Sequence, residues 1–420
     1  MSQVVHLRGE VQIPGDKSIT HRACMFGAIA EGQTRIRTAS MGRDNLATIR
    51  ILRQLGVLFS QEGADILVEG VGLGAFKAPA AVCDCGNSGT TARLMTGLLA
   101  STGFEVTLTG DASLKSRPFA RVTKPLTQMG VSFDSEMLPL SFKGEAIKGI
   151  RYHSPKASAQ VKSAVILAGL SSTDQTQVVE PRRTRDHSEK MLQAMGVVLS
   201  SEAVEKDAWQ KLTGIEIDIP GDFSAATFFL VAGSIFPDSD ISLKGIGLNE
   251  TRVGALHVLQ RMGASIEISS ERLSGGEPVA DLQVCSASLK GVEIGHEDVV
   301  LGIDEIPILA VAAAIAEGKT VVTGAEELRV KESDRLSRMV EVLRSFGIEV
   351  EEADDGMTVS GAGERANASW RTSGDHRIAM SGAILEYFAA GDFQLQDAEA
   401  VETSFPGFVE QLRGLATSAS

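Results

Sequence analysis

The chain has 420 residues, of which 43% are hydrophobic and only 5% aromatic, so large cores built mainly from aliphatic side chains are expected. At this length more than one domain is the default expectation. Acidic residues outnumber Lys and Arg by 54 to 40, and the formal net charge of −14 argues against a surface that binds nucleic acid or an anionic membrane. Affinity for anions must therefore come from local clusters of cations.

No apolar run reaches the roughly 20 residues that a bilayer crossing needs. A strand-like stretch at residues 11–13 follows closely on Met1, so no signal or transit peptide is expected. The four cysteines have neither the number nor the spacing of a disulfide framework or a zinc site, and the seven histidines show no H-E-x-x-H pattern. The sequence therefore predicts a soluble cytoplasmic protein without a metal.

A unit of about 70 residues, one sixth of the chain, is repeated along the sequence. One amphipathic helix per unit, such as residues 335–346, ends in Leu-x-x-φ-Gly-φ, where φ is apolar and the glycine stops the helix in the left-handed region. A short strand is expected after each stop, as at residues 197–199, 266–268 and 348–350. The stops are Gly56, Gly130, Gly196, Gly263 and Gly347, with a degenerate sixth copy at Ala416.

Each unit also contains a second helix, which is apolar all round, as at residues 308–316, and is therefore expected to be buried. A capping Ser or Asp is expected to open each of these helices. In chain order the openings are Ser18, Ser88, Ser158, Ser224, Asp304 and Asp375.

A longer repeat divides the chain into halves of three units each. Residues 9–18 and 214–224 share the pattern I-P-G-D-x-S, and both predict a strand, a turn and a buried helix. We interpret the two copies as the crossings between two similar domains. One domain would contain residues 1–15 and 223–420, and the other residues 16–222.

Cations gather at the openings of the buried helices. Lys17 and Arg22 flank the first opening, Arg93 lies one turn into the second, and Asp375-His-Arg377 opens the last. Helix N-termini already favour anions, because their N–H groups are unpaired and carry partial positive charge. No G-x-x-x-x-G-K-[ST] motif is present, so use of a nucleoside triphosphate is not indicated.

Four segments resemble the motifs of the 5-enolpyruvylshikimate-3-phosphate synthase family, in the family's order and over essentially the whole chain. They are P-G-D-K-S-I-T-H-R at 14–22, G-N-S-G-T-T-A-R-L at 86–94, R-V-K-E-S-D-R at 329–335 and G-D-H-R at 374–377. The resemblance implies an α/β fold of two similar domains, each of three β-α-β-α-β-β units arranged as an inside-out α/β barrel. It also implies a monomer with no metal or organic cofactor, whose active site lies in the interdomain cleft.

The resemblance further implies a reaction of chorismate and aromatic amino acid biosynthesis. In it, the enolpyruvyl group of phosphoenolpyruvate is transferred to the 5-hydroxyl of shikimate 3-phosphate, and phosphate is released. The implied catalytic residues are Lys17, Asp304 and Glu332. Shikimate 3-phosphate would contact Lys17, Ser18, Arg22, Ser158, Gln160, Arg185, Asp304 and Lys331. Phosphoenolpyruvate, and the competing inhibitor glyphosate, would contact Lys17, Asn87, Gly89, Arg117, Lys331, Arg335 and Arg377.

These roles agree with the chemistry. The 5-hydroxyl is a poor nucleophile until a carboxylate accepts its proton, and C2 of phosphoenolpyruvate becomes electrophilic only when C3 gains a proton. Asp304 matches the carboxylate beside the 5-hydroxyl and Glu332 the one near the methylene carbon, although the sequence leaves open which is the general base. Where many family members have Ser, Asn and Lys, this chain has Ala159, Glu327 and Thr403.

The sequence argues against two other functions. A sister enzyme transfers enolpyruvate to UDP-N-acetylglucosamine, but it typically has a cysteine in the loop that corresponds to residues 114–118, where this chain has none. A non-catalytic anion-binding protein would gain nothing from Asp304 and Glu332 among so many cations. Both alternatives are therefore disfavoured.

Overall fold

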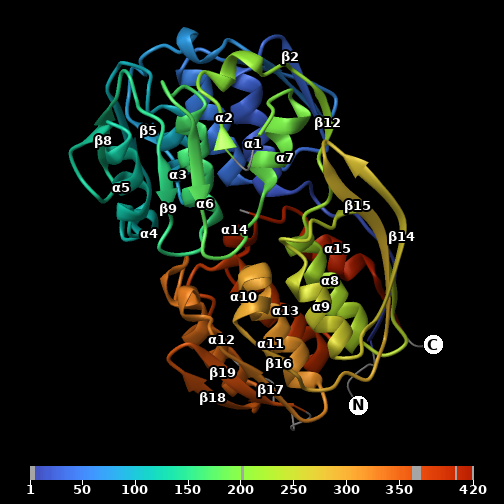
Figure 1. The fold of residues 1–420 in the computed structure, drawn as a ribbon. Coiled ribbons are helices and arrows are strands. Elements are labelled where there is room, and N and C mark those ends of the chain that lie inside the picture. Colours follow the sequence, from blue (N-terminus) through green and yellow to red (C-terminus); the bar gives the residue numbers. More distant parts are fainter. Residues whose placement is uncertain (1–4, 200–202, 362–369, 403, 419–420) are drawn as a thin grey trace. The chain divides into compact units, whose positions relative to one another are not determined.

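The computed structural model describes residues 5–199, 203–361, 370–402 and 404–418. The chain forms two compact units, each with its own hydrophobic core (Figure 1). Unit 1 comprises Met1–Pro14, Pro220–Arg272 and Pro278–Ser420, and unit 2 comprises Gly15–Ile219 and Leu273–Glu277. Thr403, one of the departures from the family pattern, lies outside the described residues.

Unit 2 contains three small sheets with one pairing pattern. In each, the first strand is parallel to the second, and the remaining pairs are antiparallel. In spatial order the sheets are β12 (Glu216–Asp218), β2 (Gln33–Arg37), β4 (Asp65–Glu69) and β3 (Leu58–Glu62); β5 (Cys83–Asp84), β6 (Val106–Thr109), β8 (Leu140–Lys143) and β7 (Ser132–Phe133); and β9 (Arg151–His153), β10 (Thr176–Val179) and β11 (Ala203–Val204).

Two sheets of unit 1 repeat this pattern. One is β16 (Glu293–Ile294), β17 (Lys319–Val322), β19 (Gly356–Ser360) and β18 (Glu349–Ala353). In the other, β1 (Val5–Val11) is parallel to β13 (Asp240–Gly247), and β13 is antiparallel to β15 (Glu277–Cys285). β14 (Ser265–Ser274) lies beside β15, and β20 (Ala416–Ser418) adds an antiparallel edge to β1. β1 ends at Val11, so the prediction of a strand at residues 11–13 is wrong by a few positions.

The strands β1 and β12 belong to the two copies of I-P-G-D-x-S. β1 pairs in parallel with β13 of unit 1, yet the helix that follows it in sequence lies in unit 2. β12 pairs in parallel with β2 of unit 2, and the next helix lies in unit 1. In each copy, therefore, the strand belongs to one unit and the following helix to the other.

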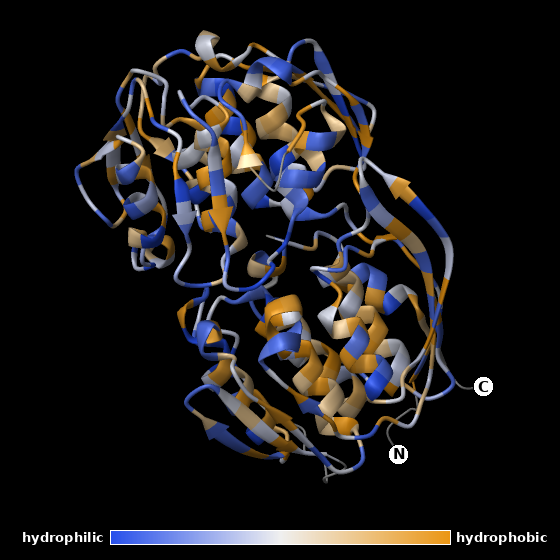
Figure 2. Ribbon diagram, viewed as in Figure 1, coloured by the Kyte–Doolittle hydropathy of each residue, from blue (hydrophilic) through white to orange (hydrophobic). Residues whose placement is uncertain are grey.

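Six buried helices form the cores. Those of unit 2 are α1 (Lys17–Ile29), α3 (Gly89–Leu98) and α6 (Ala159–Gly169); those of unit 1 are α8 (Phe223–Ile235), α11 (Ile306–Ile315) and α13 (His376–Ala390). Every residue of α8 is buried. Figure 2 shows the helices inside unit 1 in mostly hydrophobic colours, as expected for helices that are apolar all round.

Three of the six predicted helix openings are confirmed. The side chains of Ser88, Ser158 and Asp375 accept hydrogen bonds from N–H groups of the first turn of α3, α6 and α13. The other three are wrong. Asp16 and Asp222, each two residues earlier than predicted, cap α1 and α8, because a carboxylate at that position already accepts a first-turn N–H. Asp304 lies in a 3₁₀ turn, and α11 begins after Glu305.

The amphipathic helices end where the sequence predicts. Gly56, Gly130, Gly196, Gly263 and Gly347 all have positive φ, from 79° to 105°. Strands include residues 266–268 and most of 348–350, but residues 197–199 form no strand, so that prediction is wrong. The helices are α2 (Arg43–Gln54), α5 (Ala120–Gln128), α7 (His187–Ala194), α9 (Gly254–Arg261), α12 (Arg335–Ser345) and α15 (Phe408–Gly414).

Short helical segments complete the fold. They are α4 (Ala112–Lys115), α10 (His296–Gly302) and α14 (Ala398–Val401), with 3₁₀ turns η1 (Leu73–Ala75), η2 (Ala208–Lys211), η3 (Ile303–Glu305) and η4 (Glu326–Val330).

Candidate functional site

Lys17 is the first residue of α1 and carries a charge next to a helix N-terminus. Its Nζ lies 3.0 Å from Oδ2 of Asp44, and its backbone carbonyl accepts a 3.0 Å hydrogen bond from Asn45. Both partners come from α2. The Lys17 side chain remains 18% exposed, so it can reach a ligand at the opening of α1.

Arg22 lies one turn further along α1 and is almost fully buried. Its guanidinium donates to Oγ of Ser188 at 2.8 Å, to Oγ of Ser163 at 2.7 Å and to the carbonyl of Ser18 at 2.8 Å. Burial lowers the pKa of Arg22 to about 10, which still leaves it charged at neutral pH. Arg22 therefore ties α1 to α6 and α7 and brings positive charge beside Ser18.

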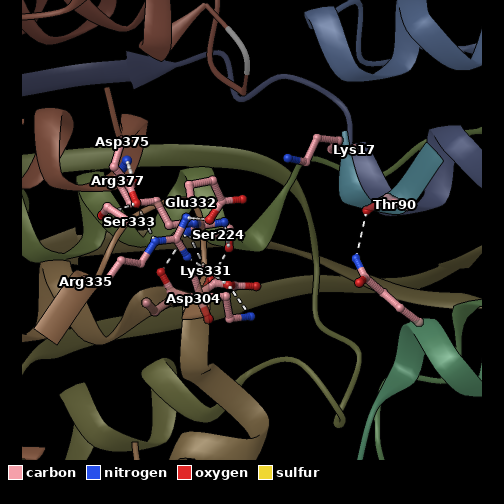
Figure 3. A network of polar contacts seen from close by, with 12 residues as sticks. Lys17, Thr90, Ser224, Asp304, Lys331, Glu332, Ser333, Arg335, Asp375 and Arg377 are labelled. Carbon is pink, nitrogen blue, oxygen red and sulfur yellow. Dashed lines mark hydrogen bonds and ion pairs between the residues drawn. The ribbon is translucent and has the colours of Figure 1, made fainter. Parts of the chain in front are cut away.

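Gln160 connects the openings of α3 and α6. Its Nε2 donates to Oγ1 of Thr90 at 3.1 Å, a contact drawn in Figure 3, and its Oε1 accepts from Arg93 at 2.7 Å. Ser158, the cap of α6, lies two residues before Gln160. The sequence places Arg93 near a helix opening without indicating a role in the site, and its contact with Gln160 makes it part of the candidate site.

Gly89 lies between two guanidinium groups. A Cβ atom added at Gly89 would come within 2.7 Å of Nη1 of Arg93 and 3.5 Å of Nη1 of Arg117. Arg117 also donates to Oδ1 of Asn87 at 2.5 Å, and Asn87 donates to Asp111 at 2.6 Å. Because only a glycine leaves this space open, an anion can approach both arginines and the N-terminus of α3.

Arg185 follows a loop that a buried lysine holds in place. Nζ of Lys162, on α6, lies 3.0 Å from Oε2 of Glu180 and 2.8 Å from Oε1 of Glu189, and it donates to the carbonyl of Thr184 at 3.3 Å. Burial by itself would lower the pKa of Lys162, but the two carboxylates outweigh it and raise the pKa. The charge of Arg185 acts on Arg22, which places both in one electrostatic environment.

In unit 1, Arg335 is the centre of a cluster of carboxylates (Figure 3). Its Nε lies 2.8 Å from Oδ2 of Asp375 and its Nη1 3.2 Å from Oδ1 of Asp304, and its Nη2 is bonded to Glu332. Lys331 Nζ is 3.4 Å from the same oxygen of Asp304. The structure thus brings the two predicted catalytic carboxylates together around one guanidinium.

Electrostatics explains why so buried a cluster is stable. Burial alone would lower the pKa of Arg335, but Asp375, Glu332 and Asp304 outweigh it and raise the pKa. Burial would raise the pKa of Asp375, but the Arg335 charge prevails and lowers it. Asp375 is therefore a carboxylate that also caps α13 and fixes Arg335 at the beginning of α12.

Arg377, in the first turn of α13, also contacts a residue of this cluster. It donates from Nη1 to the backbone carbonyl of Asp304 at 2.9 Å and from Nη2 to Oγ of Ser224 at 3.0 Å. Ser224 lies in the first turn of α8. The N-terminal ends of α8, α11 and α13 are therefore linked through Asp304 and its neighbours.

The two residue sets offer complementary chemistry. In unit 2, Lys17, Arg93 and Arg117 stand near helix N-termini, which suits phosphate and carboxylate groups. In unit 1, Asp304 and Glu332 can accept or deliver protons beside Lys331, Arg335 and Arg377. Within the described residues, no three His, Cys, Asp or Glu side chains are arranged to hold a metal ion, and no helix of that part of the chain is long and apolar enough to cross a membrane.

Comparisons with known proteins agree with this chemistry. The family model of EPSP synthase (3-phosphoshikimate 1-carboxyvinyltransferase) matches residues 1–412. A 3-phosphoshikimate 1-carboxyvinyltransferase of Desulforamulus reducens is 48% identical, with 98% of each chain covered, and one of Alkalilimnicola ehrlichii is 49% identical, covering 96% of this chain and 92% of the relative.

Solved structures confirm the predicted α/β fold class. An EPSP synthase of Acinetobacter baumannii superposes with a TM-score of 0.87 at 40% identity, covering 100% of this chain and 99% of the other. The enolpyruvyl transferase NikO of Streptomyces tendae has a TM-score of 0.78 over 100% of this chain and 98% of its own, but at 16% identity it shows the fold alone.

Proposed function

The chain belongs to the EPSP synthase family, and from this premise we propose that its two residue sets act on the same pair of substrates in a 3-phosphoshikimate 1-carboxyvinyltransferase reaction. The enzyme transfers the enolpyruvyl group of phosphoenolpyruvate to the 5-hydroxyl of shikimate 3-phosphate and releases phosphate, a step in aromatic amino acid biosynthesis. The observation that carries the proposal is the meeting of Asp304 and Glu332 at Arg335, because two neighbouring carboxylates can serve the two proton transfers of the reaction.

We assign shikimate 3-phosphate chiefly to unit 2. Ser18 and Arg22 at the opening of α1, Gln160 at the opening of α6, and Arg185 after the loop held by Lys162 can bind its phosphate, carboxylate and hydroxyl groups. The contacts from Arg22 to Ser18, Ser163 and Ser188 support this assignment, because they hold α1 against α6 and α7 before any ligand binds.

We assign phosphoenolpyruvate to the guanidinium groups of both sets. The open space at Gly89 beside Arg93 and Arg117 suits one anionic end, and Arg335 and Arg377 suit another. Because Arg335 is already paired with Asp304, Glu332 and Asp375, a bound carboxylate must replace at least one of them. Replacement of Glu332 would release that side chain to act on the substrate.

The chemistry then follows in two steps. Asp304 accepts the proton of the 5-hydroxyl as its oxygen attacks C2 of phosphoenolpyruvate, while Glu332 delivers a proton to C3, giving a tetrahedral adduct. Next, Glu332, now a carboxylate, takes a proton back from C3, the bond from C2 to the phosphate oxygen breaks as the C2–C3 double bond forms again, and Lys17 assists the departing phosphate. The pairing of Lys17 with Asp44 at 3.0 Å supports its role, because that contact holds the ammonium group at the opening of α1.

We also propose a monomer in the cytoplasm, with domains of residues 1–15 and 223–420, and of 16–222. The division of the chain at Pro14 and at Ile219 supports these boundaries, apart from Leu273–Glu277, which groups with unit 2. Burial raises the pKa of the free thiol of Cys24 to about 12, so it is a poorly reactive thiol in keeping with a reducing compartment.

A phosphate-release assay tests the function. With phosphoenolpyruvate and shikimate 3-phosphate, the protein should release phosphate in steady state. Release with UDP-N-acetylglucosamine in place of shikimate 3-phosphate would instead favour the sister activity. Binding of both anions without release from either acceptor would favour a non-catalytic anion-binding protein.

A further inference from the structure

A second buried cluster contacts Arg377 and includes the residue next to Asp304. It consists of Ser224, Arg252 and Glu305, which are 3%, 4% and 0% exposed. Ser224 comes from the first turn of α8, Arg252 from the segment before α9, and Glu305 from the η3 turn that also carries Asp304. The proposed reaction uses none of these three side chains.

The hydroxyl of Ser224 forms three hydrogen bonds, two within this cluster and one with Arg377. It donates to Oε1 of Glu305 and accepts from Nη2 of Arg252 and, at 3.0 Å, from Nη2 of Arg377. A hydroxyl can donate once and accept twice, so these contacts use its whole capacity. The side chain of Ser224 therefore has one favourable orientation, and Arg377 is bonded to it.

Glu305 acts as an anion built into the protein. Both of its oxygens accept from Nη1 of Arg252, at 3.0 and 3.1 Å, and Arg377 Nη1 lies 3.6 Å from Oε1. A carboxylate with no solvent exposure is tolerated only when it is paired and hydrogen-bonded in this way. The first turn of α8 contributes as well, because a helix N-terminus favours negative charge.

The sequence repeat makes this arrangement informative. Ser224 is the last residue of the second I-P-G-D-x-S copy, just as Ser18 is the last residue of the first. Ser18 lies at an opening that we assign to a substrate anion, whereas the opening at Ser224 already contains the carboxylate of Glu305. In unit 1 a protein side chain thus takes the position of a bound anion.

We propose that Glu305, through Ser224, is a positioning residue that fixes Arg377 for phosphoenolpyruvate and holds the adjacent Asp304 in place. The inference rests on the roles proposed above for Arg377 and Asp304. Two contacts connect the clusters: Arg377 donates from Nη2 to Ser224 and from Nη1 to the backbone carbonyl of Asp304 at 2.9 Å. Loss of the internal anion would release Arg377 and leave Arg252 with the more distant carboxylate of Asp222, whose Oδ1 is 3.7 Å from Nη2.

The test uses Ser224→Ala and Glu305→Gln in the full chain. Each should lower kcat/KM for phosphoenolpyruvate by about 10- to 100-fold, the scale of a small displacement of positioned groups. Dissociation constants for shikimate 3-phosphate, measured without phosphoenolpyruvate, should stay within about twofold because its proposed contacts lie mainly in unit 2. Arg261→Gln, which removes an exposed ion pair with Asp298 in the same unit, is the matched control and should change neither value.

A rescue experiment separates positioning from stability. Glu305→Ala removes the chemical equivalent of acetate, so added acetate should raise kcat/KM of this variant at least about tenfold, whereas equal chloride or acetamide should not. Thermal melting of each variant identifies any that fails to fold, in which case Ser224→Ala alone decides. The proposal is overturned if folded Ser224→Ala and Glu305→Gln bind phosphoenolpyruvate and turn over like the unaltered protein, or if acetate restores no activity to folded Glu305→Ala. Failure of the proposed function would appear differently, as inactivity of the unaltered protein.

Discussion

Adding a methyl group at Gly89 tests the proposed phosphoenolpyruvate site most specifically. In Gly89→Ala the new Cβ atom would stand 2.7 Å from Nη1 of Arg93, closer than such atoms approach in proteins. The end of Arg93 must therefore move, which weakens its 2.7 Å bond to Gln160. The methyl group also narrows the space in front of Arg117, whose Nη1 would be 3.5 Å away.

The size of the effect depends on ligand length. Crowding by one methyl-sized group costs a ligand about 1–3 kcal/mol, or roughly 10- to 200-fold in affinity. Glyphosate, the longer molecule, should bear most of this cost, so its inhibition constant should rise at least about tenfold more than the KM for phosphoenolpyruvate. Unaltered protein, which has Gly89, should be inhibited.

Steady-state inhibition kinetics measure both constants in one assay. Gly74→Ala is the matched control, because a Cβ atom there would have no neighbour within 4 Å, and it should change neither constant. Equal increases for glyphosate and phosphoenolpyruvate in Gly89→Ala, or no increase in either, would show that Gly89 does not line the site and that the reasoning is wrong.

Three further predictions follow from the same contacts. Asp304→Asn should lower turnover by about a hundredfold or more while shikimate 3-phosphate still binds, and near-normal turnover would transfer the base role to Glu332. Lys162→Met should destabilise the protein to urea by about 3–5 kcal/mol, because Glu180 and Glu189 would lose their shared cation; an unchanged midpoint would contradict this. Asp375→Asn should be most destabilising at neutral pH. Burial alone would raise the pKa of Asp375, but Arg335 lowers it below the ordinary value of 3.8. The stability that the Asp375 carboxylate contributes is therefore present above pH 3.8 and is lost as the pH falls through the lower folded-state pKa. The urea midpoints of variant and unaltered protein should thus converge in acid.

Much of the fold was predictable because it is periodic. The glycine stops were located correctly since Gly56 and its counterparts need positive φ, which few other residues tolerate. The prediction that Ser18 and Ser224 cap their helices is wrong because an aspartate two residues earlier competes for the same N–H groups. In such I-P-G-D-x-S segments both residue types are good caps, and sequence spacing alone does not separate them.

The site was predictable residue by residue from motifs, but its pairings were not. Nothing in the sequence indicates that Arg335 holds Asp304, Glu332 and Asp375 together, since Asp304 and Asp375 are distant from it along the chain. The position of Arg93, two residues after G-N-S-G-T-T, is the sequence signal that indicates it. Glu305 gave no signal except its position beside Asp304, because burial of a glutamate depends on partners that tertiary structure supplies.

The central claim is that this chain forms a tetrahedral adduct by protonating C3 of phosphoenolpyruvate and then removes a proton from the same carbon. Incubation with both substrates in D₂O, followed by mass spectrometry and NMR of the product, tests it directly. Because C3 passes through a methyl group in the adduct, the enolpyruvyl product should carry deuterium at its methylene carbon. Product with no deuterium at that carbon, or no enolpyruvyl product at all, would contradict the account.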